Sequence, residues 1–288
     1  MKRNLDGARI LITGASSGIG RELARQAAKA GAKLVIGARR AERLEALKAE
    51  ILETYAKSGR KGPEPRIEIV VGDVTLPEVR EALVQRCVTA FGGVDVLINN
   101  AGGAATGLFE GNLPERARRV MELNFFAPVE LCRLVIPLMK KWKEPLSDTK
   151  RPAKPVPPMI VNLSSVVGLR GVTHYSEYCA GKAAIRAFSE SIRTELHRYG
   201  IEILVVCPGS TDTAFFTDYL ENTGEPSWPH HSRVTPAYVA GQILKAIRKG
   251  KMEIIPFFLG RVMNRLNQFF PRFLESAMVF FEEKGGKG

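Results

Sequence analysis

Apolar and polar positions divide the chain into two kinds of segment that alternate. Short apolar runs rich in β-branched residues predict strands, and longer stretches with apolar residues three or four apart predict amphipathic helices. The predicted strands are Arg9–Thr13, Lys33–Ala38, Ile67–Val71, Val94–Asn99, Met159–Ser164, Glu202–Cys207 and Met252–Ile255. The predicted helices are Ile19–Ala30, Ala41–Lys57, Pro77–Phe91, Pro114–Trp142, Glu177–Tyr199 and Pro236–Arg248.

The order of these elements indicates the fold class. Alternating strands and helices predict a parallel sheet with helices on both faces. The strands are nearly continuous apolar runs, as expected when both faces are covered. We therefore expect residues 1–255 to form a single α/β domain of the Rossmann type, with a doubly wound parallel sheet of about seven strands. Ligands of such sheets bind beyond the carboxyl ends of the strands.

Two segments do not follow this alternation. Residues 144–158 are rich in proline and lysine and predict an extended surface insertion, which is either a docking segment or a plain loop. Residues 256–288 form a carboxyl-terminal extension, and within 256–281 the apolar positions have helical spacing with a break near Pro271. Its basic polar face and its Phe-, Leu- and Met-rich apolar face are typical of a membrane interface. A lid over an apolar pocket and packing on a partner subunit are the alternatives.

The composition is that of an ordinary globular protein, with 288 residues, of which 45% are hydrophobic and 25% charged. The four cysteines form no CxxC pair, so we expect free thiols in a reducing, cytoplasmic compartment, without a disulfide framework or a zinc site. We expect neither a signal peptide nor a membrane-spanning helix. The net charge of +12 indicates either anionic partners or a soluble basic surface. No nucleic-acid-binding motif is found, so a nucleic-acid partner is not expected.

A glycine-rich turn, T-G-A-S-S-G-I-G at 13–20, joins the first predicted strand to the first predicted helix. Glycines let the backbone turn tightly and approach a phosphate, and the helix N-terminus supplies free N–H groups and a positive dipole end. Glycine also serves ordinary turns. The strand–turn–helix setting favours a dinucleotide site here.

Tyr178 and Lys182 lie four residues apart in a predicted helix, so they share one helix face. A free tyrosine has a pKa of about 10, too high for proton transfer at neutral pH. A neighbouring ammonium and a positive charge on a bound dinucleotide would lower the pKa of the phenol. The bare pattern is equally compatible with an ordinary helix, so its interpretation depends on the other motifs.

Taken together and in order, the motifs resemble those of the short-chain dehydrogenase/reductase family from about residue 7 to residue 250. They are T-G-A-S-S-G-I-G at 13–20, Asp73-Val74, Asn99-Asn100-Ala101-Gly102, Asn124, Ser165, Tyr178-x-x-x-Lys182, and Pro208-Gly209 with Thr213. The resemblance implies a nicotinamide-dependent oxidoreductase that transfers a hydride between the cofactor and a carbonyl or secondary alcohol. No metal is expected.

The resemblance also implies the roles of individual residues. Tyr178 is the acid/base, Lys182 also binds the ribose hydroxyls, Ser165 holds the substrate oxygen, and Asn124 holds a water that links the lysine to solvent; Ser164 is a lesser candidate. Asp73 would bind the adenine amino group. The candidate cofactor-binding residues are Thr13, Gly14, Ser16, Ser17, Gly18, Ile19, Gly20, Arg39, Arg40, Asp73, Val74, Asn100, Ala101, Gly102, Tyr178, Lys182, Pro208, Gly209, Thr211 and Thr213.

The end of the second predicted strand indicates which cofactor is used. By resemblance, Ala38 stands where NAD-preferring members carry aspartate, and Arg39 stands where NADP-preferring members often carry arginine. A guanidinium can hold a phosphate through two hydrogen bonds. Ser17 is neutral where some NADP-dependent members have a second basic residue, and Arg39 and Arg40 could simply begin an exposed helix. We predict NADP(H).

The substrate is predicted to be apolar. Phe215, Phe216, Tyr219 and Trp228 lie in the predicted substrate lid, 214–233, and His174 and Tyr175 are expected at its mouth. The sequences at 178–196 and 208–216 resemble 3-ketosphinganine reductases as well as 3-oxoacyl and steroid reductases. We therefore predict a lipidic ketone as substrate and a homo-oligomer, a dimer or tetramer. A catalytically idle NADP(H)-sensing or scaffold protein is the alternative.

Overall fold

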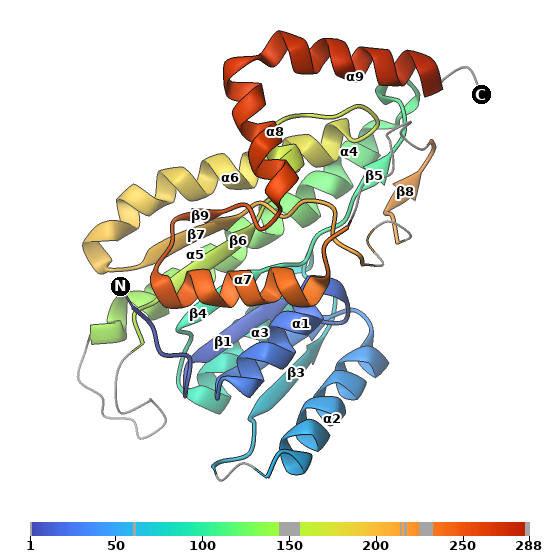
Figure 1. The fold of residues 1–288 in the computed structure, drawn as a ribbon. Helices are drawn as coiled ribbons and strands as arrows, with labels where there is room; N and C mark the ends of the chain where they lie inside the picture. Colours follow the sequence, from blue (N-terminus) through green and yellow to red (C-terminus); the bar gives the residue numbers. More distant parts are fainter. Residues whose placement is uncertain are drawn as a thin grey trace.

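The computed structural model describes residues 2–59, 62–143, 156–213, 215, 218–224 and 233–285. Its centre is a seven-stranded sheet in the order β3-β2-β1-β4-β6-β7-β9, with every neighbouring pair parallel (Figure 1). The strands are β1 (Arg9–Thr13), β2 (Lys33–Ala38), β3 (Ile67–Val71), β4 (Val96–Asn99), β6 (Met159–Leu163), β7 (Glu202–Val206) and β9 (Glu253–Ile254). The predicted doubly wound Rossmann-type sheet is therefore confirmed.

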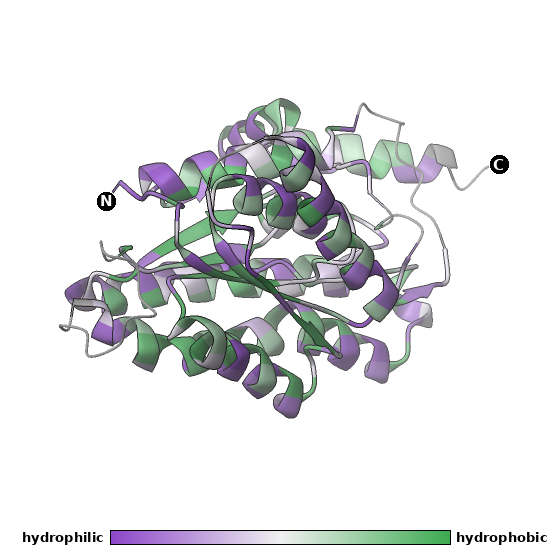
Figure 2. Cartoon of the chain, turned by 90° about the horizontal axis from the view of Figure 1, so that it is seen from below, coloured by the Kyte–Doolittle hydropathy of each residue, from purple (hydrophilic) through white to green (hydrophobic). Residues whose placement is uncertain are grey.

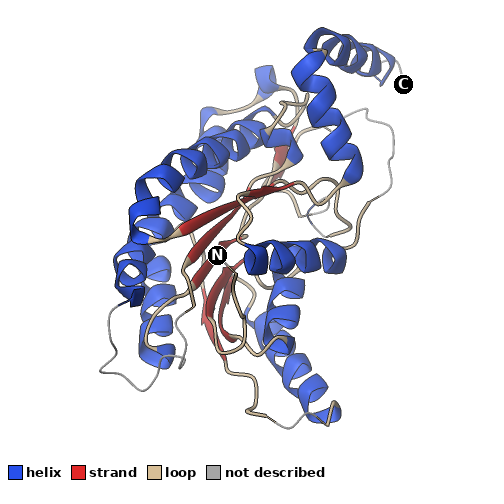
Figure 3. Cartoon of the chain, turned by 60° about the vertical axis from the view of Figure 1, so that its left-hand side comes forward, coloured by secondary structure: helices blue, strands red, loops and turns tan. Residues whose placement is uncertain are grey.

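Helices cover both faces of this sheet (Figure 3). Helices α1 (Gly18–Lys29), α2 (Ala41–Lys57) and α7 (Pro236–Lys249) pack on one face, and α3 (Pro77–Phe91), α5 (Ala127–Lys140) and α6 (Ser176–Leu196) pack on the other. The strands alternate their side chains between the two resulting apolar cores. The strands at the centre of the molecule are accordingly coloured as mainly hydrophobic in Figure 2.

The predicted strand ends were slightly too long. β4 begins at Val96 instead of Val94, β6 and β7 each end one residue early, and β9 is shorter at both ends. Parallel pairing ends where the neighbouring strand ends, and periodicity along a single strand does not report that point. The short 3₁₀ turns lie outside the sheet, at Phe109–Gly111, Lys141–Lys143, Val166–Gly168 and His197–Tyr199.

The predicted single helix Pro114–Trp142 was wrong in one respect. The structure divides it into α4 (Pro114–Met121), a π-helical turn (Glu122–Phe126) and α5, followed by a 3₁₀ turn. Pro128 has no N–H, so it cannot donate to the carbonyl four residues earlier, and the hydrogen-bond ladder is interrupted at this position. Such π-helical turns often accompany functional sites.

A second, two-stranded parallel sheet was not predicted. It pairs β5 (Ala105–Thr106) with β8 (Glu221–Asn222), which follow the fourth and sixth long strands of the chain. Two residues are too few to show a hydrophobic period.

The carboxyl-terminal extension forms two helices, α8 (Phe258–Phe269) and α9 (Pro271–Gly285). They meet at Phe270, so the predicted helix break near Pro271 is confirmed, although the second helix continues past residue 281. Among the described residues, no helix has the length and apolar character needed to cross a membrane. The division into residues 1–255 and 256–288 as separate units stays a prediction. Most of the predicted insertion (144–155) lies outside the described residues, and so do several residues of the predicted substrate lid, Phe216 and Trp228 among them.

Candidate active site

A cavity of about 1180 Å³ lies at the carboxyl ends of the central strands. All the predicted cofactor-binding residues except Gly20 line it, together with Ser165, Tyr178 and Lys182 of the predicted catalytic set. The exceptions, Gly20 and Asn124, lie directly behind this lining, as described below. The structure therefore brings the sequence-predicted residues together at one site, and their individual roles stay predictions.

The glycine-rich turn is fastened to the end of β4. The amide of Asn100 donates to the carbonyls of Thr13 (2.9 Å) and Gly14 (3.1 Å), and the hydroxyl of Thr13 accepts from the backbone N–H groups of Asn100 and Ala101. A Cβ on Gly20 would lie 2.3 Å from the carbonyl oxygen of Gly14. Gly20 is thus required for packing beneath the turn rather than for contact with the cavity.

The end of β7 closes over the same turn. Gly18 has a φ of 55°, and a Cβ there would lie 2.9 Å from the methyl group of Thr213. The hydroxyl of Thr211 donates to the carbonyl of Gly209 at 3.0 Å. Glycine backbone with free N–H groups at the start of α1 leaves a cradle that a side chain would fill, which fits a pyrophosphate.

The two arginines after β2 differ in their surroundings. Arg40 donates to the hydroxyls of Ser16 (3.1 Å) and Ser17 (3.0 Å) and pairs with Asp218. Arg39 is mostly exposed, with its guanidinium 4.0 Å from the carboxylate of Asp73. Arg40 therefore connects the glycine-rich turn to the substrate side of the cavity, a contact that sequence spacing did not indicate.

Tyr178 lies in the first turn of α6, with its side chain buried in an apolar cluster that includes Ala104, Ala105 and Leu220. Burial raises the pKa of Tyr178 above its ordinary value, and a hydrogen bond with Ser165 opposes this shift. The ring of Phe215 lies 5.4 Å from the phenol ring. The phenol is therefore held protonated at neutral pH, beside the hydroxyl of Ser165.

Lys182 is buried one helical turn after Tyr178. Its ammonium donates to the carbonyl of Leu163 at 2.9 Å and lies 5.6 Å from the centre of the Tyr178 ring. Burial lowers the pKa of Lys182 to about 8. In the chain by itself, burial therefore outweighs the effect of this ammonium on the pKa of Tyr178. The predicted lowering of that pKa by the ammonium together with a bound cofactor stays a prediction.

Asn124 lies in the π-helical turn, behind the lysine. Its amide donates to the carbonyls of Gly103 (2.8 Å) and Val120 (2.9 Å), and its buried Oδ1 has no hydrogen-bond partner among the described residues. A Cβ on Gly102 would lie 2.9 Å from this Oδ1 and 3.0 Å from the Lys182 ammonium. The backbone of Gly102 thus lies close to both Asn124 Oδ1 and the Lys182 ammonium. An unpaired buried acceptor at this position fits a bound water.

Ser164 has a structural role, since its hydroxyl donates to the backbone carbonyl of Lys182 at 2.7 Å. Of the two residues expected at the substrate mouth, Tyr175 lines the cavity, and His174 pairs instead with Glu282 of α9 at 2.9 Å. The pattern of apolar and polar residues gave no signal for this contact between segments so distant in sequence.

The carboxyl-terminal helices also line the cavity, which sequence reasoning only raised as one of several alternatives. The residues involved are Leu259, Gly260, Met263 and Asn264 of α8 and Phe281 of α9. Just before α8, Phe257 packs so closely on Gly209 that a Cβ there would lie 2.1 Å from the ring. The wall of the cavity opposite the glycine-rich turn is therefore mostly apolar.

This fold and site define a nicotinamide-dinucleotide-binding α/β protein. Residues 8–224 match the short chain dehydrogenase family, so the chain belongs to the short-chain dehydrogenase/reductase family. It is 32% identical over 259 residues to the dehydrogenase/reductase SDR family member 7B of Bos taurus, and the match covers 88% of this chain and 75% of that protein. Membership of this family supports oxidoreductase activity.

Solved structures share the fold over nearly the whole chain. A short-chain dehydrogenase from Streptomyces avermitilis is 28% identical, with a TM-score of 0.74, and the match covers 94% of this chain and 97% of that one. A family member from Burkholderia phymatum in complex with NAD has a TM-score of 0.76 at 23% identity, covering 94% and 96% of the two chains. The second likeness shows the fold alone.

Proposed function

We propose that the protein is an NADP(H)-dependent reductase of an apolar ketone. The observation that carries the proposal is that Ser165, the buried Tyr178 and the buried Lys182 line the same cavity, with the lysine one helical turn after the tyrosine. A serine and a protonated tyrosine side by side form a pair of groups that can bind a carbonyl oxygen and protonate it.

The bound nicotinamide supplies the hydride. Ser165 donates a hydrogen bond to the substrate oxygen and holds it beside the phenol. Tyr178 transfers its proton to that oxygen as negative charge develops there. Burial keeps the phenol in its protonated form at neutral pH, which is the form that reduction requires, but the same burial makes the phenol a weaker acid. The Lys182 ammonium would stabilise the resulting phenolate and then return a proton to it, and a water at Asn124 Oδ1 would reprotonate the lysine.

NADP(H) is proposed over NAD(H) because β2 ends at Ala38 instead of an acidic residue, and two arginines, Arg39 and Arg40, follow it. Arg40 is already held at the glycine-rich turn by Ser16 and Ser17, and Arg39 is exposed at the cavity edge. A 2′-phosphate placed between them would receive charge-assisted hydrogen bonds.

A lipidic ketone, such as a 3-ketosphinganine, a 3-oxoacyl compound or a steroid, is the proposed substrate. The apolar part of the cavity wall includes Val167, Leu169, Val172, Leu220, Leu259, Met263 and Phe281. Apolar lining of this extent stabilises an apolar chain or ring system by removing it from water.

A panel of ketones tests this proposal. NADPH oxidation is followed with long-chain 3-ketones, steroid ketones and short water-soluble ketones, and we expect turnover to favour the apolar members. Preference for short polar ketones would contradict the substrate class. NADPH binding without turnover of any ketone would instead indicate a cofactor-sensing or scaffold protein.

The outer face of α8 and α9 is proposed to contact an anionic membrane surface in the cytoplasm. Phe258, Phe269, Phe270, Phe273 and Phe280 are half exposed or more, and Arg261, Arg265 and Arg272 lie exposed among them. Aromatic side chains at the level of the lipid headgroups with arginines beside them suit this interface. A lipidic substrate could then enter the cavity directly from the membrane.

Vesicle co-sedimentation tests the membrane contact in the full chain. Binding to vesicles with anionic lipid should weaken with salt and should be lost in the double variant Phe269→Ser, Phe273→Ser. Phe109→Ser is the matched control, because Phe109 is 72% exposed but lies far from α8 in sequence, in the turn after β5. If the wild type does not sediment and the double variant instead changes the dimer or tetramer expected for this family, the surface packs on a second copy.

A further inference from the structure

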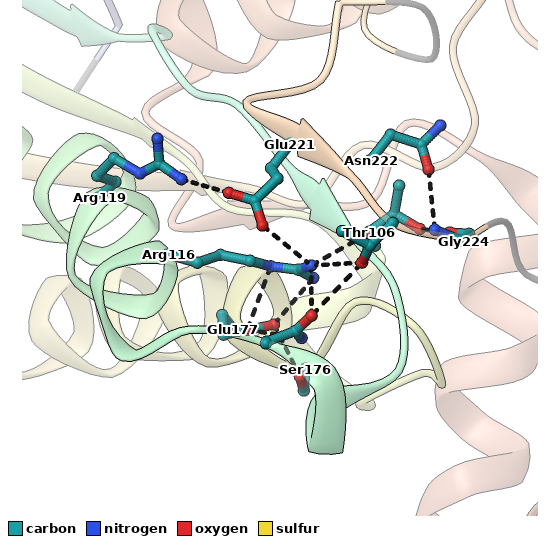
Figure 4. A network of polar contacts seen from close by, with 10 residues as sticks. Thr106, Arg116, Arg119, Ser176, Glu177, Glu221, Asn222 and Gly224 are labelled. Atoms are coloured by element: carbon teal, nitrogen blue, oxygen red, sulfur yellow. Dashed lines mark hydrogen bonds and ion pairs between the residues drawn. The ribbon is translucent and has the colours of Figure 1, made fainter.

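Arg116 is a buried guanidinium outside the predicted catalytic set. It projects from α4, has an exposed fraction of 1%, and is the largest fully buried side chain among the described residues. Its partners are the carboxylates of Glu177 (3.3 Å from Nε) and Glu221 (3.9 Å), Asn112 Oδ1 (2.7 Å), and the hydroxyl of Thr223 and the carbonyl of Thr106 (3.1 Å each) (Figure 4). Such an ion is retained in a fold only when it is paired and hydrogen-bonded.

These partners come from separate segments that meet at the guanidinium (Figure 4). Thr106 belongs to β5, Thr223 directly follows β8, and Glu177 is in the first turn of α6. Thr106 and Thr223 are also joined by backbone and side-chain hydrogen bonds, at 2.9 and 3.1 Å. Arg116 therefore ties the small β5–β8 sheet to the start of the helix that carries the active-site tyrosine.

Glu177 is as enclosed as its partner. Its exposed fraction is 7%, and its carboxylate also accepts hydrogen bonds from Asn112 (3.1 Å) and Ser176 (2.8 Å). The next residue along α6 is Tyr178, so the carboxylate fixes the helix turn from which the phenol projects.

The β5–β8 sheet also packs against Tyr178, through the residues that flank its two strands. Ala104 and Leu220, which flank β5 and β8, are joined by a backbone hydrogen bond of 2.8 Å and pack against Tyr178 in one apolar cluster. Tyr219 adds a hydroxyl contact of 2.9 Å to Tyr175. Residues 218–224 are thus attached to Arg40 at their start, through Asp218, and to Arg116 at their end.

We propose that Arg116 and Glu177 are a positioning pair that fixes the Tyr178 phenol against the substrate-binding segment 218–224. The proposal rests on the proposed reductase function, and it concerns the rate of proton transfer and not the binding of the cofactor. Neither residue of the pair contacts the glycine-rich turn or Arg39, and segment 218–224 reaches Arg40 only through the partly exposed pair with Asp218, so NADPH affinity should change little.

Full-length variants Arg116→Met, Glu177→Gln and the double variant R116M/E177Q test the pair. Each single variant removes one member of the buried pair and should lower the melting temperature, most strongly in Arg116→Met, because Glu221 still lies 3.9 Å from Arg116 in Glu177→Gln. The double variant should recover most of that loss. Arg118→Met is the matched control, because Arg118 lies on the same helix, is largely exposed and pairs only with Glu115, at 4.0 Å, among the described residues. The control should leave both stability and turnover unchanged.

The double variant distinguishes an effect on the position of the Tyr178 phenol from an effect on the stability of the fold. We expect its kcat to stay reduced by about tenfold to a hundredfold, as for a misplaced acid, with an NADPH dissociation constant within about twofold of the wild type. Hydrogen–deuterium exchange supplies a measurement that needs no turnover: the amides of 174–178 and 218–224 should lose protection, and those of 13–20 should keep it.

Two outcomes would overturn the proposal. If the double variant recovers kcat together with its melting temperature, the pair only stabilises the fold. If exchange in residues 218–224 is unchanged, the pair does not hold that segment. Should the wild type reduce no ketone at all, the proposed function fails, and the exchange measurement still decides whether Arg116 and Glu177 fix the segment.

Discussion

Two regions that line the same cavity differ in how deeply their residues are buried. Tyr178 and Lys182 are buried, with exposed fractions of 8% and 5%. Both belong to α6, and Lys182 bonds to the end of β6. Helices α8 and α9 approach from the other side, and their aromatic residues are largely exposed, 74% for Phe269. Among the described residues, their polar contacts to the loop before α6 are those of Arg170 with Glu275 and Asn267 and of His174 with Glu282.

The two regions suit different tasks: the buried residues suit proton transfer, and the exposed helices suit the entry of a substrate. Buried groups interact strongly in a low dielectric, so removing one of them has a large and specific effect. The pair of Arg170 with Glu275 is partly exposed and screened by solvent, so it should contribute little to holding these helices on the cavity. A site that must exclude water during proton transfer and still admit a large apolar substrate needs both kinds of wall.

The largest effect is expected at the buried phenol. Tyr178→Phe removes the proton donor and leaves the cavity shape intact, so turnover should fall by roughly a hundredfold to ten-thousandfold. NADPH affinity, measured by calorimetric titration, should stay nearly unchanged. A variant that keeps more than about a tenth of the wild-type rate would show that Tyr178 is not the acid.

The cofactor end should respond less strongly. Arg39→Ala and Arg40→Ala should each weaken NADPH binding by about tenfold to a hundredfold, because a charge-assisted hydrogen bond to the 2′-phosphate is lost. NADH affinity serves as the internal control, because NADH carries no such phosphate. Equal losses for both cofactors, or a wild-type preference for NADH, would refute the assignment.

The buried region could be predicted from the sequence, and the exposed region only in outline. The motifs around Thr13, Asn100 and Tyr178 recur because their backbone and side chains are fixed by a few local constraints, and the continuous apolar strands make the sheet unambiguous. The buried pair of Arg116 with Glu177 could not be predicted, because it joins residues 61 positions apart through a sheet of two-residue strands. The position of α8 at the cavity was only one of the predicted alternatives, because amphipathic spacing identifies an apolar face but not what covers it.

Lys182 offers a test of burial that needs no substrate. Its pKa of about 8 lies below the ordinary value of 10.5, so between those pH values the unfolded chain binds a proton that the folded protein has released. The free energy of unfolding of the wild type should therefore rise with pH relative to Lys182→Met, by up to about 1.4 kcal/mol per pH unit. Urea unfolding of both proteins from pH 7 to 10 measures this difference. A difference that does not change across that range would contradict the burial of an ionisable lysine.

The smallest effect is expected where α8 and α9 are attached. Arg170 donates to Asn267 at 3.2 Å and pairs with Glu275, whose side chain is 63% exposed, so the contact should contribute no more than about 1 kcal/mol. If these helices form the apolar wall of a substrate site, Arg170→Gln should raise KM for a long-chain ketone by roughly twofold to fivefold, in line with that energy. It should leave kcat for a short ketone unchanged, because a short substrate does not reach Met263 or Phe281. Arg133→Gln is the matched control, since it breaks an exposed pair with Glu130 on α5, at 3.2 Å. Equal losses for the long and the short ketone would mean that Arg170 acts on the loop before Tyr178 rather than on the helices, and the division between chemistry and access would then no longer hold at this position.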